Sequence, residues 1–129
     1  MNKLPAGKYW VGDCCYFLDK KINWSEEFCE PFFNNEGGKP FLIRGHLVAA
    51  SSTAYGDGVY PSNIGFEFGV DAGLIGVVPQ ALCTTTVTSS SLGVLVDFKN
   101  EFTVSYDNGT ISIGDIKIYS DDDSFYEDL

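Results

Sequence analysis

The sequence predicts a mainly β protein with one short helix, on three observations. Polar and apolar residues alternate on either side of an Asn-Gly pair near the C-terminus, which is typical of a β-hairpin. Only one stretch, residues 24–32, is a good helix candidate. Aromatic residues make up 15% of the chain and can fill a substantial core. We therefore expect an α+β fold in which antiparallel sheets form a small sandwich or barrel.

The first part of the chain predicts two short strands, Lys8–Val11 and residues 15–18, separated by Gly12-Asp13. The helix is expected to follow. Asn23 or Ser25 can accept the free amide protons of its first turn. Its apolar face is expected to combine the side chains that recur at spacings of three and four, namely Trp24, Phe28 and either Phe32 or Cys29.

After the helix the pattern favours strands and turns. The hairpin at 102–113 is expected to turn at Asn108-Gly109, where both residues tolerate positive φ. The remaining expectations are one bent strand or two over 39–52, turns over 53–65, strands at 66–70, 74–78 and 116–119, and a β-prone strand or a loop over 84–91.

Length and charge predict one domain and an acidic tail. The 129 residues fit a single β-rich domain, expected over residues 1–120. The net charge is −10, and residues 121–129, DDDSFYEDL, hold five acids and no base. Half of the net negative charge therefore lies in this tail. Direct binding to nucleic acid is disfavoured, because an acidic chain repels phosphates.

Neither a membrane helix nor a signal peptide is visible in the sequence. No apolar run approaches the length of about 18 residues that a membrane span needs, and the N-terminal MNKLPAGKYW lacks an apolar segment. We therefore expect a cytoplasmic protein. Thiols stay reduced in the cytosol, so the four cysteines are expected to be free.

The adjacent pair Cys14-Cys15 is the stretch that most resembles a metal-binding or catalytic site. Neighbours in a strand point to opposite faces, so the two thiols cannot grip one ion together. Cys29 and Cys83 stand alone, and His46 is the only histidine. The negative charge of Asp13 is expected to raise the pKa of a neighbouring thiol. A thiol that stays protonated is a poor nucleophile, so a catalytic cysteine is disfavoured here. We interpret the cysteines as small buried apolar residues and expect no metal and no cofactor.

No assembled catalytic motif is present either. His46 lies between apolar residues, and the chain lacks a Gly-x-Ser-x-Gly elbow, a P-loop and a dinucleotide fingerprint. A triad assembled from distant positions stays open. The sequence therefore predicts a protein that is not an enzyme, with a small carboxylate-based hydrolase as the alternative.

The residues suited to binding are aspartates at turns, aromatics and one arginine. The aspartates either cap turns or converge into a cluster, which the sequence alone leaves open. Arg44 is the only arginine and suits an anion site or an ordinary surface position. The candidate ligand- or partner-binding residues are Asp13, Tyr16, Trp24, Arg44, Tyr55, Asp57 and Asp71.

Three segments, taken together, resemble a set of small uncharacterised proteins encoded by bacteriophages and prophages: LPAGKYWVGDCCYFL, GDGVYPSNIGFEFGVDAGLIGVVP and FTVSYDNGTISIGDIKIYS. The opening matches at Gly12-Asp13 and at Cys15-Tyr16, whereas Cys14 stands where the resemblance leads us to expect proline. A second match runs through Val70-Asp71-Ala72-Gly73 and the following Leu-Ile-Gly. The departure at Cys14 argues against a special role for that thiol.

The resemblance implies a phage origin rather than an activity. Together with the acidic charge and the absence of an assembled catalytic motif, it leads us to expect an accessory protein that inhibits a bacterial defence system by stoichiometric binding. Two routes are open: masking a basic host protein with an acidic surface, or sequestering a small nucleotide signal in a pocket. A virion structural protein is a further alternative. The expected partners are thus a host defence protein or a nucleotide signal, with a homo-oligomer also open.

Overall fold

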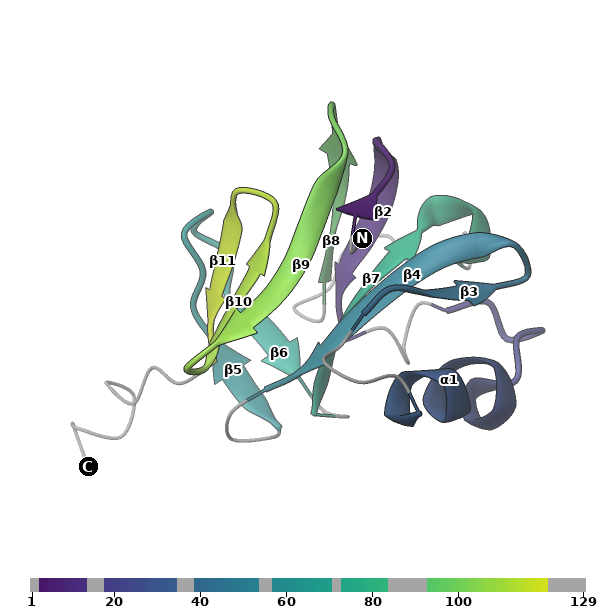
Figure 1. Cartoon of the computed structure of the whole chain (residues 1–129). Helices are drawn as coiled ribbons and strands as arrows, with labels where there is room; N and C mark the ends of the chain where they lie inside the picture. The colour runs from purple at the N-terminus through teal and green to yellow at the C-terminus, as the bar shows by residue number, and fades with distance from the viewer. Residues whose placement is uncertain are drawn as a thin grey trace.

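A computed structural model describes residues 3–13, 18–34, 39–53, 57–70, 73–83 and 93–120. It confirms the predicted fold class, because strands dominate and the single short helix packs on one side of them (Figure 1). All strand pairs are antiparallel, and the sheets do not close into a barrel. The expectations for the strand at 15–18 and for residues 84–91 lie largely outside the described residues.

A five-stranded sheet forms the centre of the molecule. Its order is β3-β4-β7-β2-β8. In chain order its strands are β2 (Gly7–Gly12), β3 (Phe41–Ile43), β4 (His46–Ser52), β7 (Leu74–Pro79) and β8 (Gly93–Phe98). The central strands therefore come from distant parts of the chain.

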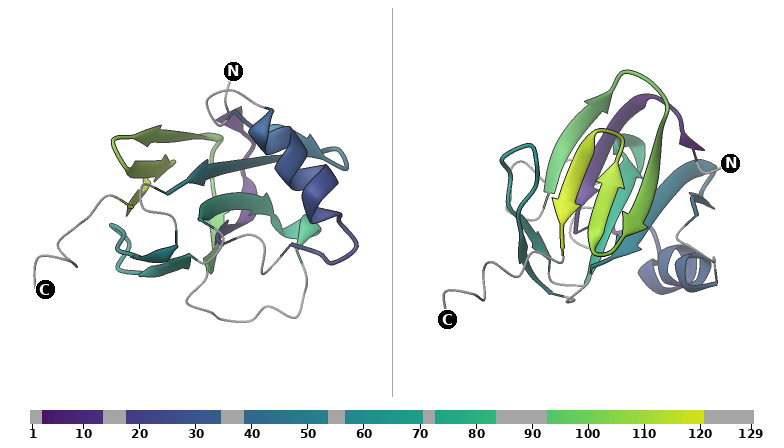
Figure 2. Two further views of the ribbon diagram at one scale, coloured as in Figure 1. Left: turned by 90° about the horizontal axis from the view of Figure 1, so that it is seen from below. Right: turned by 60° about the vertical axis from the view of Figure 1, so that its left-hand side comes forward.

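A second sheet covers one face of the first, as the two views in Figure 2 show. Its order is β1-β9-β10-β11. The four strands are β1 (Lys3–Leu4), β9 (Phe102–Asp107), β10 (Thr110–Ile113) and β11 (Ile116–Tyr119). A separate pair joins β5 (Gly58–Tyr60) to β6 (Phe68–Val70).

The predicted hairpin turn is confirmed. Asp107 pairs with Thr110, which leaves Asn108 and Gly109 as a two-residue loop with φ of 51° and 89°. Positive φ at both positions defines the mirror-image turn that suits the twist of paired strands.

The stretch 39–52 is two strands rather than one bent strand. Ile43 pairs with His46, so Arg44 and Gly45 form a second two-residue turn, with φ of 49° and 84°. Sequence reasoning missed this turn because arginine is an uncommon residue at positive φ. It also missed β8 entirely, and β5 within the region expected to hold only turns.

The predicted helix exists but begins with an unusual winding. A π-helical segment, η2 (Trp24–Cys29), leads into α1 (Glu30–Phe33). Asn23 caps it as predicted, because its Oδ1 accepts the N–H of Glu26 at 3.0 Å. A single 3₁₀ turn, η4 (Gln80–Leu82), follows β7. π-helical turns are rare, and no simple sequence pattern predicts them.

The five-stranded sheet is buried on both faces. Trp10 and Val78 face the helix, while Val11 and Val77 face the second sheet. The helix-side core is rich in aromatic rings, and the core between the sheets contains five isoleucines from β10, β11 and β7 among its members. Burial on both faces explains why β4 and β7 read as continuous apolar runs without alternation.

Candidate functional site

The best candidate site is a groove between β4 and β9, which we call the β4–β9 groove. Its volume is about 480 Å³, within the range of roughly 300–1,000 Å³ typical of ligand clefts. The lining residues are Phe32, Ala50, Ser51, Ser52, Thr53, Val104, Ser105 and Tyr106.

One wall of the groove is the end of β4 and the residue after it. These positions carry only small side chains, so the wall leaves space in front of it. The hydroxyl of Ser51 donates to the carbonyl of Ser52 at 3.1 Å, and Thr53 N–H donates to the carbonyl of Gly73 at 3.1 Å. The wall is thus held in place by β7 and offers hydroxyl groups to a ligand.

The opposite wall is β9, and Phe32 of α1 completes the lining. The alternation of β9 directs Val104 and Tyr106 to the same face as the buried Phe102. Tyr106 lies near the end of the strand, where the core thins out, and it is 51% exposed. A half-exposed aromatic ring of this kind is a common contact in protein interfaces.

The lining of the β4–β9 groove carries no charged side chain at neutral pH. Hydroxyls, backbone groups and two aromatic rings can hold a ligand there, but none of the lining residues offers a cation for a phosphate. The groove therefore suits a polar or cationic occupant better than a phosphate-bearing one.

Arg44 holds the β3–β4 turn against the helix. Its Nε donates to Oε1 of Glu27 at 2.9 Å, and its Nη2 donates to Oε2 of Glu27 at 3.1 Å and to the carbonyl of Lys21 at 2.7 Å. The hydrogen bonds from Arg44, with one from the N–H of Asn23, lower the pKa of Glu27, and Glu27 in turn raises the pKa of Arg44. The sole arginine is thus already paired, and it links a strand turn to the start of the helix.

Two smaller hollows lie beside this arginine and share His46 and Ala81. The larger, of about 440 Å³, includes Lys8 and His46, and the smaller, of about 200 Å³, includes Arg44 and His46. They bring the only histidine together with cationic groups. Asp19 lines the smaller hollow and Glu27 neutralises Arg44, so the net positive charge there is modest.

Three of the other predicted site residues are described by the structure, and none of these three lines the groove. Asp13 is fully buried after β2, Trp24 stacks on Phe28 with ring centroids 4.4 Å apart, and Asp57 is exposed before β5. Tyr16, Tyr55 and Asp71 lie outside the described residues. Trp24 thus belongs to the helix-side packing, and the convergence of Asp13, Asp57 and Asp71 stays the open question that the sequence left.

The two cysteines that the structure describes are free thiols. Burial, with a smaller contribution from Asp19, raises the pKa of Cys83 to about 12, and burial also raises the pKa of Cys29. Both thiols are therefore protonated at neutral pH, which fits a packing role. Cys14 and Cys15 lie outside the described residues. In the described part of the chain, no three His, Cys, Asp or Glu side chains gather where they could hold a metal ion.

Sequence reasoning missed the groove residues. The run Ala50-Ser51-Ser52-Thr53 offered one usable signal, because small polar residues directly follow a buried strand. Tyr106 appeared only as an apolar position of the hairpin. What brings the two segments together is the stacking of two sheets, which the sequence pattern does not encode locally.

A comparison with protein-family models, with curated proteins and with solved structures finds no match to this chain. Among the described helices, none combines the length and the apolar character that crossing a membrane requires.

Proposed function

We propose that this protein is a phage-type accessory protein that acts in the host cytosol, inhibiting a bacterial defence system by stoichiometric binding without catalysis. Its mode of action is the masking of a basic host protein. The phage origin rests on the sequence resemblance of the N-terminal, central and C-terminal segments.

The observation that carries the masking mode is the distribution of charge. The chain has a net charge of −10, and the β4–β9 groove is lined without any cation. The described chain ends at Ser120, whose N–H and hydroxyl both donate to the carbonyl of Gly109, and residues 121–129 of the sequence add five acids. Such a surface attracts a basic partner and speeds its association.

A second candidate mode, sequestration of a nucleotide signal, is favoured by a different feature. The hollows around His46 include Lys8 and Arg44, which are the groups that a phosphate prefers. Glu27 occupies both donor nitrogens of Arg44 that face it, which makes this mode the weaker of the two.

Affinity capture with the full chain, followed by an inhibition assay, tests the proposal. We expect a basic nucleic-acid-handling host protein to be recovered, and its activity to fall to zero at an equimolar ratio. Binding should weaken as salt is raised from low to physiological concentration. Recovery of phage capsid proteins alone contradicts the proposal and favours a virion role.

Incubation with cyclic nucleotides and ADP-ribose-type signals, followed by heat release, separates the remaining alternatives. A signal released intact supports sequestration. A signal returned chemically altered, at substoichiometric protein, contradicts the absence of catalysis and favours the hydrolase.

A further inference from the structure

Two strand edges that face the β4–β9 groove have no strand partner among the described residues. On β9, β1 pairs only with Phe102 and Thr103, whereas residues 104–107 pair on their other side with β10. On β4, β3 pairs only with residues 46–48, whereas residues 49–52 pair on their other side with β7. Across the described ranges, no strand pairs with the outer edge of 104–107 or of 49–52.

The register shows which backbone groups of β9 point outward. In an antiparallel ladder, successive residues direct their N–H and C=O to opposite neighbours. The carbonyl of Thr103 accepts the N–H of Gly114, at the end of β10, at 2.9 Å. Thr103, Ser105 and Asp107 therefore point to β10, and Val104 and Tyr106 direct their backbone groups to the open edge.

The same argument applies to β4. Thr53 N–H donates to the carbonyl of Gly73, on the β7 side. Ser51 therefore also points to β7, and Ala50 and Ser52 direct their backbone groups away from it. All four outward-pointing residues line the groove, so its walls present rows of backbone donors and acceptors.

We propose that the groove accepts an extended, Lys- or Arg-bearing segment of the partner as an added β-strand on β9, in line with β1. This inference rests on the masking function proposed above and names the contact through which it operates. Unpaired edges of this kind recruit peptides by main-chain hydrogen bonds, while the pockets beside the edge select side chains.

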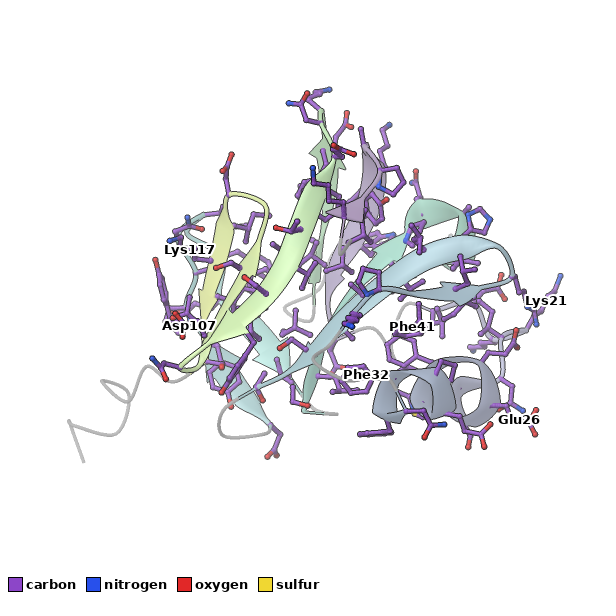
Figure 3. The ribbon with its side chains drawn as sticks, viewed as in Figure 1. Lys21, Glu26, Phe32, Phe41, Asp107 and Lys117 are labelled. Carbon is purple, nitrogen blue, oxygen red and sulfur yellow. The ribbon has the colours of Figure 1, made fainter. Side chains whose placement is uncertain are left out.

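The side chains around the groove favour a basic segment. The exposed ring of Tyr106 can lie against a guanidinium or ammonium group, and the lining has no cation to repel it. Asp107 is exposed next in the strand, and Figure 3 shows it at the end of β9, away from Phe32 beneath β4. The β4 wall beside this edge carries only small side chains.

A synthetic nine-residue peptide of Val and Thr alternating with Arg is the probe, used with the full chain. We expect it to bind, and its binding to slow hydrogen exchange at the amides of Val104 and Tyr106. The amide of Ser105 already donates within the β9–β10 ladder and should change little. The matched control peptide carries Glu in place of Arg and should bind at least tenfold more weakly.

Two substitutions of Tyr106 separate the contribution of its backbone N–H to peptide binding from the contribution of its ring. Tyr106→Pro removes an outward N–H without removing a bond to β10, and should weaken peptide binding by about tenfold or more. Tyr106→Ala keeps that N–H, and should weaken binding less while retaining the slowed exchange at Val104. Circular dichroism and melting curves verify folding. If Tyr106→Pro does not fold, the exchange pattern of the unsubstituted chain decides.

Unchanged exchange at Val104 and Tyr106 on binding, equal affinity for the Arg and Glu peptides, or no binding at all would overturn the inference. Its failure is distinguishable from failure of the proposed function. A host protein that is masked equally well by Tyr106→Pro leaves the masking function standing and removes the groove from it. If the peptide binds as expected but no basic host protein is inhibited, the groove stands as a peptide-binding edge and the masking function is wrong.

Discussion

The helix-side core and the β9–β11 strands depend on different kinds of information. Phe28 of η2 stacks on Trp24 and meets Phe41 of β3 edge to face, with ring centroids 5.3 Å apart (Figure 3 labels Phe32 and Phe41 of this cluster). The β9–β11 strands instead join neighbours in sequence through two tight turns. The first region is therefore specified by contacts between distant segments, and the second largely by local patterning.

The comparison teaches that a short helix need not carry its own stability. Two turns of helix are marginal in water, whatever their composition. Here Phe28 and Phe32 are buried and Arg44 ties the first turn to a strand hairpin. The helix should therefore unfold together with its contact to the sheet, whereas the hairpin should tolerate damage elsewhere.

The largest expected effect is from Phe28→Ala. Phe28 is fully buried among aromatic rings, so the cavity should cost about 3–5 kcal/mol of the free energy of unfolding, measured by urea denaturation. Phe33→Ala is the matched control, because Phe33 is 72% exposed, and it should change stability by less than about 0.5 kcal/mol. Equal losses for both would show that the helix does not pack as described.

Gly109→Val tests the β9–β10 turn, in the region that local patterning specifies. Gly109 has φ of 89°, which a β-branched residue adopts only with strain, so the free energy of unfolding should fall by about 1 kcal/mol or more. Asn108→Gly keeps the turn geometry available and should be nearly neutral. A neutral Gly109→Val would place the turn elsewhere.

Glu27→Gln should produce a smaller, pH-dependent loss. The pKa of Glu27 is lowered by Arg44, so this carboxylate stabilises the fold above its ordinary pKa of about 4.3, and the contribution disappears as pH falls through the lowered value. The difference in melting temperature between the native chain and Glu27→Gln should therefore shrink between pH 7 and pH 3. Glu26→Gln, one residue away, exposed and outside the ion pair with Arg44, is the matched control.

Removal of residues 121–129 should have the smallest effect on stability. Five acids in nine residues repel one another, and we expect the melting temperature to stay within a few degrees. Binding to a basic partner should weaken, and more so at low salt than at high salt. A collapse in stability would show that Phe125-Tyr126 belong to the core or to a subunit interface.

Local patterns predicted several elements closely. The turn at Asn108-Gly109, the cap at Asn23 and the strands near β2, β7 and β11 follow from residue types at short spacing. The turn at Arg44-Gly45 did not, because the side-chain bonds that accompany positive φ at Arg44 come from Glu27 and Lys21, about twenty residues away. The π-helical winding of η2 has no signal of this kind.

The candidate site was not predicted, except for the general expectation of a binding surface. The turn aspartates and Trp24 were predicted as site residues because their residue types alone suggest binding. The groove consists of serines, a threonine and a tyrosine that look ordinary in the sequence. Its character comes from two strand edges that no described strand pairs with and from the absence of charge in its lining, and both depend on which strands are neighbours.

The sequence by itself determined the fold class, the acidic balance and the hairpin, because alternation, charge and turn chemistry act between residues close in the chain. Only the tertiary structure decided that β2 lies between β7 and β8, that Arg44 is tied to Glu27 and that β4 ends beside β9. These arrangements bury apolar surface that is shared by segments far apart in the chain, such as Leu4 and Phe102, which pair across 98 residues. No short stretch of the sequence contains both sides of these contacts.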